Sequence, residues 1–112
     1  MKKIKLLLVF SAVMYLSGCG TDSETAKVVA QPDPQAGEAL YTKNCKVCHA
    51  QGISGAPILG NKKMWQSRAV KGQEVLVNHA VNGFGLMPAK GGKTALTEEE
   101  ISEIVGYMLS QL

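Results

Sequence analysis

The pentapeptide Cys45-Lys46-Val47-Cys48-His49 constrains this chain more than any other segment. Two thiols three residues apart can form thioethers with the two vinyl groups of one porphyrin, and a histidine directly after them is then held beneath the iron. The pattern therefore predicts one covalently bound haem c per chain, attached through Cys45 and Cys48, with His49 as the proximal iron ligand. A motif this short also arises by chance, so other features of the sequence must agree with it.

The first eighteen residues have the organisation of an export signal. Three lysines within the first five positions precede an apolar run, Leu6 to Leu16, which is too short to span a bilayer comfortably and suits a signal peptide. The run ends in Leu16-Ser17-Gly18-Cys19, which resembles the bacterial lipobox. That resemblance implies cleavage before Cys19 and lipidation of its thiol. The alternatives are an uncleaved amino-terminal anchor and an ordinary signal peptide in which Cys19 has no role.

We therefore expect three segments: a lipoprotein signal peptide over residues 1–18, a lipidated tether over 19–33 and a haem domain over 34–112. Residues 20–33 are small, polar and proline-containing, so they cannot bury much apolar surface. Fully extended, they reach roughly 45–50 Å, enough to hold a small domain clear of a membrane. The haem domain has few aromatic residues, and its core is marginal unless a buried haem adds apolar mass.

Cysteine usage and charge narrow the classes of function. With Cys19 assigned to lipid and Cys45 and Cys48 to haem, none of the three cysteines is left for a disulfide, although an exported compartment favours disulfides. The chain has twelve basic and nine acidic residues, and loss of the signal peptide removes three lysines, which leaves nine of each. Because balanced charge gives no strongly basic surface, we expect no nucleic-acid partner.

The remaining sequence predicts helices joined by loops rich in glycine and proline. A helix is expected to begin at Asp33-Pro34, with Asp as the N-cap and Pro at the first helical position, and to run through Tyr41. Gly37 lies inside this helix, where glycine costs about 1 kcal/mol relative to alanine, and it suggests that another backbone approaches closely. Residues 50–61 and 84–95 contain several glycines and prolines and are predicted loops.

Three further helices are predicted. The first two cover about 62–67 and 72–81; the inward side chains of the second are Val75, Leu76, Ala80 and Val77, with Gly83 as a left-handed stop. The last helix is the clearest, because Thr97 and Glu100 form a capping box. Its apolar side chains repeat at helical spacing and form one face: Ile101, Ile104, Val105, Met108 and Leu109. The sequence therefore predicts an all-α fold with three to four helices wrapped around one haem.

Met87, in Gly85-Leu86-Met87-Pro88, is the candidate for the sixth iron ligand. A methionine in a glycine–proline loop has no apolar helix face to join, whereas Met64 and Met108 are interpreted as core residues. Coordination by histidine and methionine raises the reduction potential of a haem. His79 is the alternative sixth ligand, but inside a predicted helix it is more simply a surface or hydrogen-bonded histidine.

Three residues are candidates for the shell around the haem. The Pro57 carbonyl is placed to accept a hydrogen bond from the second ring nitrogen of His49. Trp65 and Arg68 offer an indole N–H and a guanidinium, which are natural donors to buried haem propionates. The plainer alternative makes Trp65 a core residue with its N–H at the surface and leaves Arg68 in solvent.

These motifs together resemble the class I monohaem cytochromes c, most closely the small bacterial cytochrome c5 group. The resemblance covers about residues 37–109 and rests on C-K-V-C-H, G-A-P, a W-x-x-R step, a helix ending in N-G, M-P-A-K-G-G, L-T-E-E-E-I and Y-M-L. It implies axial coordination by His49 and Met87. It also implies that the first and last helices cross near Gly37 and Tyr107. Many c5 sequences carry two more cysteines after the Met-Pro segment, and this chain has none there.

The expected function is single-electron transfer without catalysis. Iron coordinated on both sides leaves no position for a small-molecule substrate, so electrons pass through an exposed haem edge to exported redox proteins. The balanced charge favours a weak, partly apolar docking patch around Cys45 and the Met87 loop, consistent with a small transient interface. We expect an exported lipoprotein, anchored to a membrane and facing the periplasm or the cell exterior. One alternative is a small haem enzyme or gas-binding haem protein in which Met87 does not ligate iron. Another uses Cys45 and Cys48 as a thiol–disulfide pair or as half of a zinc site.

Overall fold

The computed structural model describes residues 33–112. The predicted signal peptide, Cys19 and the predicted tether up to residue 32 lie outside the described residues. Within residues 33–112 the chain forms helices and no β-strand, in agreement with the all-α prediction. The elements in chain order are α1 (Pro34–Asn44), α2 (Lys46–His49), the 3₁₀ turn η1 (Ile53–Gly55), α3 (Lys62–Ala69), α4 (Gln73–Asn82), the 3₁₀ turn η2 (Ala89–Gly92) and α5 (Glu98–Ser110).

Helix α1 begins where the sequence predicts. The Asp33 carboxylate accepts a hydrogen bond from the Gln35 backbone N–H at 2.9 Å, and Pro34 occupies the first turn, where no N–H is needed. At the other end of the helix, the Cys45 backbone N–H still donates to the carbonyl four residues earlier, at 2.9 Å. Helix α1 therefore leads directly into the haem-attachment motif.

Helix α5 has the predicted capping box. The Thr97 hydroxyl accepts from the Glu100 backbone N–H at 3.2 Å, and the Glu100 carboxylate accepts from the Thr97 backbone N–H at 2.9 Å. Two N–H groups that the helix itself cannot pair are thus satisfied. Leu109 is half-buried, and the other four members of the predicted apolar face are buried: Ile101, Ile104, Val105 and Met108.

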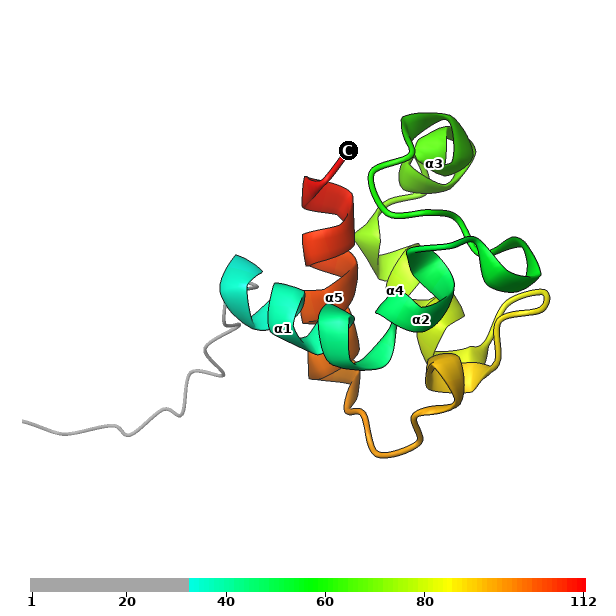
Figure 1. The fold of residues 1–112 in the computed structure, drawn as a ribbon. Coiled ribbons are helices and arrows are strands. Elements are labelled where there is room, and N and C mark those ends of the chain that lie inside the picture. The colour runs from blue at the N-terminus through cyan, green and yellow to red at the C-terminus, as the bar shows by residue number, and fades with distance from the viewer. Residues whose placement is uncertain (1–32) are drawn as a thin grey trace, which may run out of the picture.

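Helices α1 and α5 cross at Gly37 (Figure 1). A Cβ atom at this position would lie 2.5 Å from the Glu103 carbonyl oxygen and 2.9 Å from the Tyr107 Cβ, both on α5. Beside the crossing, the rings of Tyr41 and Tyr107 lie 5.6 Å apart between centroids. The predicted crossing is confirmed, and it explains why a residue that is unfavourable in a helix stands here.

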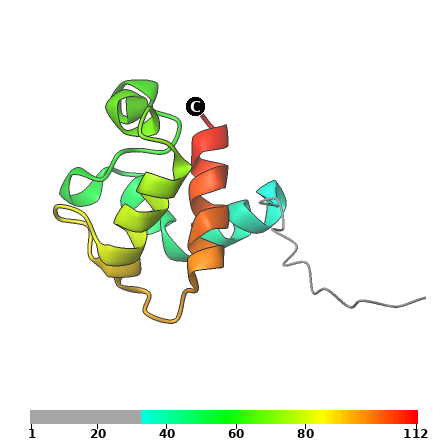
Figure 2. The ribbon, with the colours of Figure 1, turned by 180° about the vertical axis from the view of Figure 1, so that it is seen from behind.

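Helix α4 also packs against α5, as the view from behind shows (Figure 2). Leu76 and Val77 are buried as predicted, and Ala80 is half-buried. The prediction for Val75 is wrong, since 39% of this residue is exposed. Successive residues of a helix point about 100° apart, so three consecutive side chains cannot all face the same neighbour.

Gly83 ends α4, but not in the predicted left-handed helical conformation. Its φ of +86° is combined with a ψ of 151°, which is an extended backbone with positive φ. A Cβ atom here would lie 2.9 Å from the Ala89 backbone nitrogen and 3.0 Å from the Met87 carbonyl oxygen. Glycine is therefore required both by the backbone angle and by the close return of the loop that carries Met87.

The core is formed by side chains of four helices and of the loop before α5: Tyr41, Trp65, Leu76, Val77, Leu96, Ile101, Ile104, Val105 and Met108. None of the large side chains among residues 33–112 is completely buried. The apolar core is thus thin, as expected for a domain that needs additional apolar mass.

None of the helices within residues 33–112 combines the length and the apolar character that crossing a bilayer requires.

Candidate haem site

A cavity of about 360 Å³ opens between α2, the loop after it, α3, α4 and the loop that carries Met87. Its walls are largely apolar. It is lined by every site residue that the sequence predicts within the domain: Cys45, Cys48, His49, Pro57, Trp65, Arg68 and Met87. Residues from both halves of the domain therefore meet at one place.

The attachment motif folds as one helical turn. The backbone N–H groups of Cys48 and His49 donate to the Cys45 carbonyl at 3.2 and 3.1 Å. Residues at positions i, i+3 and i+4 lie on one face of a helix. The C-x-x-C-H spacing therefore turns two sulfur atoms and one imidazole toward a single ligand.

His49 is buried, with 8% of its surface exposed. Its Nδ1 lies 2.9 Å from the Pro57 carbonyl oxygen. A carbonyl oxygen only accepts, so the hydrogen bond puts the ring proton on Nδ1 and leaves the Nε2 lone pair for a metal. The predicted hydrogen bond between His49 and Pro57 is confirmed, and it fixes the ring in the way that metal-ligating histidines are usually fixed.

Trp65 is buried and supports the same histidine. Its ring stacks on the His49 imidazole with 6.2 Å between centroids, and its Nε1–H donates to the Ile58 carbonyl at 2.8 Å. The sequence predicts this N–H as a donor to a haem propionate. The structure instead gives it a protein acceptor, because α3 lays the indole against the loop that also contains Pro57.

Arg68 is half-buried at the wall of the cavity. One of its guanidinium N–H groups donates to the Met64 carbonyl one turn earlier in α3. Because a guanidinium carries five N–H donors, the others remain for a carboxylate in the cavity. Of the two residues predicted to hold propionates, only Arg68 has the donors for that role.

Met87 lies at the end of a tight hairpin after α4. Phe84 and Met87 exchange two backbone hydrogen bonds, each of 3.0 Å. Gly85, the first residue between them, has a φ of +61°, which suits glycine at the turn of a hairpin. Met87 is half-buried and lines the cavity. A thioether from the hairpin and an imidazole from α2 therefore share the same space.

His79, the alternative sixth ligand, lines the same cavity from α4 and is half-buried. Its ring stacks on Phe84, with 4.1 Å between centroids and 14° between planes. The sequence favours a surface histidine here, whereas the structure brings it to the edge of the cavity. Its ring face is engaged by Phe84, so His79 already has a packing role in the structure.

Cys45 and Cys48 are half-buried free thiols. The pKa of the Cys45 thiol is raised to about 11, first by burial and then by the neighbouring Cys48, with Lys93 acting in the opposite direction. At neutral pH this thiol is protonated and is a weak nucleophile.

Sequence reasoning did not identify the buried hydroxyl of Tyr41, which lies beside the attachment motif. Its hydroxyl is buried and has no hydrogen-bond partner within residues 33–112. Burial raises the pKa of Tyr41, and Tyr107 and Cys45 act in the same direction. A buried hydroxyl without a partner costs about 1–3 kcal/mol. An unpaired polar group thus stands one helical turn before the first attachment cysteine.

The mouth of the cavity carries an apolar rim, where the sequence predicts a partly apolar docking patch around Cys45 and the Met87 loop. We define this rim by four exposed side chains that line the cavity: Val47, Ile53, Phe84 and Leu86. Their exposed fractions range from 44% to 79%. Val47 lies on the short helix α2, and the other three belong to turns and glycine-rich loops with no hydrophobic periodicity. The sequence therefore predicts the region of this patch, but it does not identify the four side chains that form it.

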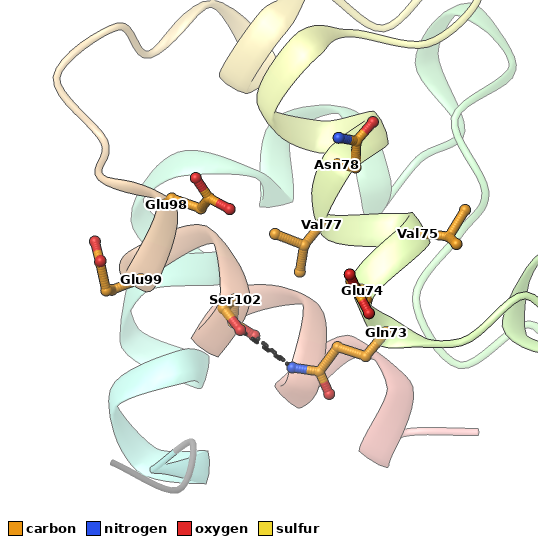
Figure 3. A pocket seen from close by; sticks show the side chains of 8 residues that line it. All are labelled: Gln73, Glu74, Val75, Val77, Asn78, Glu98, Glu99 and Ser102. Atoms are coloured by element: carbon orange, nitrogen blue, oxygen red, sulfur yellow. Dashed lines mark hydrogen bonds between the residues drawn. The ribbon is translucent and has the colours of Figure 1, made fainter. Parts of the chain in front are cut away.

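A larger hollow, of about 790 Å³, lies on a different face of α4 and beside the start of α5 (Figure 3). Three glutamates line it, Glu74, Glu98 and Glu99. The Gln73 amide donates to the Ser102 carbonyl and hydroxyl at 3.1 and 3.3 Å, which ties the two helices together. Among residues 33–112, no cysteine, histidine or methionine lines this hollow. Size alone therefore does not identify the functional site.

The donor set of the smaller cavity fits one covalently bound haem c. Two thiols lie on one helical face, an imidazole keeps Nε2 free, a thioether comes from a separate loop, and the walls are apolar. A porphyrin buried there would also supply the apolar mass that the thin core lacks.

Comparison with known proteins agrees with this assignment. Residues 32–108 match the family model described as cytochrome c oxidase, cbb3-type, subunit III. The chain is 40% identical to cytochrome c-555 of Chlorobaculum thiosulfatiphilum, with 70% of this chain and 96% of the relative covered. It is 31% identical to cytochrome c5 of Ectopseudomonas mendocina, with 62% and 82% covered.

Two solved structures are similar in fold and sequence. One is a chain of the electron transfer complex of nitrite reductase with cytochrome c, with a TM-score of 0.67, 41% identity, and 72% of this chain and 98% of that chain covered. The other is cytochrome c551 of Ectothiorhodospira halophila, with a TM-score of 0.59, 34% identity, and 68% and 99% covered. This chain belongs to the family of class I monohaem c-type cytochromes, which are electron-transfer proteins that carry covalently bound haem c.

Proposed function

We propose that this protein is a membrane-tethered single-electron carrier in which His49 and Met87 are the axial ligands of the haem iron. The observation that supports this most strongly is the hydrogen bond between His49 Nδ1 and the Pro57 carbonyl. It leaves Nε2 available in a cavity that Met87 also lines. In this proposal Cys45 and Cys48 hold the haem through thioethers.

When bound, haem c supplies a one-electron couple between ferric and ferrous iron. The residues of the chain set the properties of that couple. Pro57 holds the His49 ring, the hairpin presents the Met87 thioether, and the cavity walls around both are largely apolar. A soft thioether favours ferrous iron and raises the potential. With two axial ligands from the protein, the iron offers no site to a substrate, which separates this proposal from a haem enzyme in which Met87 does not ligate.

Covalent attachment is tested by extracting denatured protein with acidified organic solvent. We expect the wild type to keep its haem, because thioether bonds survive denaturation, and Cys48→Ser to reduce the yield of holoprotein several-fold or to abolish it. Cys19→Ser is the matched control in the fraction that is still exported, since it removes the cysteine that lies outside the haem domain. Haem that extracts freely from the wild type contradicts the assignment.

The proposed partners are exported redox proteins. The apolar rim at the mouth of the cavity favours a small and transient interface of the kind that redox partners form. One structurally similar cytochrome c is known in an electron transfer complex with nitrite reductase. A redox enzyme of this general kind is therefore a reasonable type of acceptor or donor for this chain.

The proposed tether rests on the sequence. Residues 1–18 have the features of a lipoprotein signal peptide, and Cys19 stands at its predicted cleavage site. A single acyl chain binds a membrane only marginally, so stable anchoring requires the several chains of a bacterial lipoprotein. Helix α1 begins at Pro34, which gives the haem domain a folded start beyond the predicted tether of residues 19–33.

Cys19→Ser is expected to move the protein from the membrane fraction to the soluble or unprocessed fraction. Wherever the variant is still exported, its haem spectrum should equal that of the wild type, because lipid acts on the tether and the haem domain folds independently of it. Fractionation measures the first effect, and mass spectrometry of the mature amino terminus identifies the modification. An unmodified amino terminus at any residue other than Cys19 removes the lipid anchor from the proposal.

A further inference from the structure

The ring of Phe84 connects the Met87 hairpin to helix α4. It stacks on the His79 imidazole with 4.1 Å between centroids and 14° between planes. The Lys71 ammonium lies 5.9 Å from the same ring centroid, within the range of a cation–π contact. Phe84 is 55% exposed, so burial in the core does not account for its position. The contacts with His79 and Lys71 account for the position of the ring.

Phe84 is also bound tightly to Met87 through the backbone. The two residues exchange two hydrogen bonds of 3.0 Å across a two-residue turn. On the side of α4, Gly83 approaches so closely that a Cβ atom would lie 3.0 Å from the Met87 carbonyl oxygen. A displacement of Phe84 therefore displaces the backbone of Met87, and the Phe84–His79 stack fixes one end of this short hairpin to a helix.

We propose that Phe84 and His79 are positioning residues that hold the Met87 thioether toward the haem iron. The inference rests on the proposed ligation by Met87 and adds the contacts that keep this ligand in place. The stack ties the hairpin to α4, and the hairpin hydrogen bonds pass that restraint on to Met87. In this role His79 acts through its ring face and does not coordinate iron.

The consequence is measurable because added ligands compete with the thioether. Imidazole binds ferric iron only when Met87 has left it, so its apparent affinity reports how strongly the protein favours the methionine-bound state. Aromatic pairs contribute enough to change an equilibrium constant by roughly two- to tenfold. Loss of the stack should therefore strengthen imidazole binding by about that factor.

The test is an imidazole titration of the oxidised holoprotein, followed by its visible spectrum. Phe84→Leu keeps an apolar side chain and removes the ring, and it should bind imidazole roughly two- to tenfold more tightly than the wild type, with a weaker near-infrared sulfur-to-iron band. Phe84→Tyr is the matched control, because it keeps the ring and should retain the affinity and the band of the wild type. Val70→Ala removes an apolar side chain that is 81% exposed outside the cavity, and it should also leave both unchanged.

A double-mutant cycle separates the stack from independent effects. His79→Ala alone should strengthen imidazole binding as Phe84→Leu does, and the double variant should add little to either, because both substitutions remove the same contact. Additive effects, or an affinity of Phe84→Leu equal to that of Phe84→Tyr, would overturn the proposal. Circular dichroism of each variant checks that the helices are intact.

Met87→Ala distinguishes this inference from the proposed function. If this variant opens the iron to imidazole while Phe84→Leu behaves like the wild type, the ligand assignment stands and the positioning role is wrong. If Met87→Ala changes neither the band nor the imidazole affinity, Met87 is not the ligand, and both proposals fall together.

Discussion

Met87→Ala is expected to abolish the near-infrared sulfur-to-iron band of the oxidised protein and to open the iron to added imidazole. The reduction potential should fall by on the order of a hundred millivolts, because axial ligands set haem potentials over a range of roughly 0.8 V and the soft thioether favours the ferrous state. The protein should still carry its haem, since attachment depends on Cys45 and Cys48.

The expectation follows from where the hairpin holds this residue. Met87 is half-buried in the wall of the cavity, and its backbone is fixed by two hydrogen bonds to Phe84. Alanine keeps this backbone and removes only the sulfur. Met64→Leu is the matched control: Met64 belongs to α3, does not line the cavity, and its replacement should leave the band and the potential unchanged.

The main alternative to Met87 as the sixth iron ligand is His79. It lines the same cavity, so a wild type that lacks the sulfur-to-iron band, together with a spectrum that changes in character when His79 is replaced, would identify a bis-histidine centre. The potential would then be low, because two nitrogen ligands favour ferric iron more than a thioether does. A band that survives Met87→Ala and disappears in another methionine variant would equally contradict our ligand.

Local patterns predicted the helices well because their causes lie within a few residues. The Asp33 cap and the Thr97–Glu100 capping box depend on neighbouring side chains, and both are present in the structure. The same is true of the attachment motif, whose thiols and imidazole meet within one helical turn. These features need no tertiary information, which is why the sequence alone identifies them.

Features set by tertiary packing were predicted less well. Val75 is exposed because the position of α5 determines which side chains of α4 are buried. That position cannot be obtained from the hydropathy of the residues in α4. Trp65 donates to the Ile58 carbonyl because α3 rests on a loop whose path the sequence does not reveal. The stack between His79 and Phe84 likewise depends on the loop folding back to the helix.

Gly37 shows how a single residue reports a tertiary contact. Replacing it with alanine in an exposed helix would stabilise a protein by roughly 0.5–1 kcal/mol, because glycine loses more conformational freedom on folding. Here the added Cβ would lie 2.5 Å from the Glu103 carbonyl oxygen, which belongs to the backbone of α5 and cannot rotate away. For Gly37→Ala, helix propensity therefore predicts a higher free energy of unfolding, whereas the close approach of α5 predicts a lower one.

We expect the steric clash at the helix crossing to outweigh the gain in helix propensity. Gly37→Ala should lower the free energy of unfolding of the holoprotein by about 1–3 kcal/mol, the usual cost of overpacking, and Gly37→Val by more. Because small domains are stabilised by only about 5–15 kcal/mol, the valine variant should accumulate poorly as holoprotein.

Ala39→Val is the matched control for this prediction. It adds the same kind of side chain to an exposed position of α1 and should cost only the few tenths of a kcal/mol, roughly, that separate the helix propensities of valine and alanine. Denaturant unfolding of the three variants, followed by far-ultraviolet circular dichroism and by the haem absorbance, measures each free energy. A Gly37→Ala protein more stable than the wild type would mean that α1 and α5 do not cross at this residue. The second contact at that position, with the Tyr107 Cβ at 2.9 Å, makes such an outcome incompatible with the fold described above.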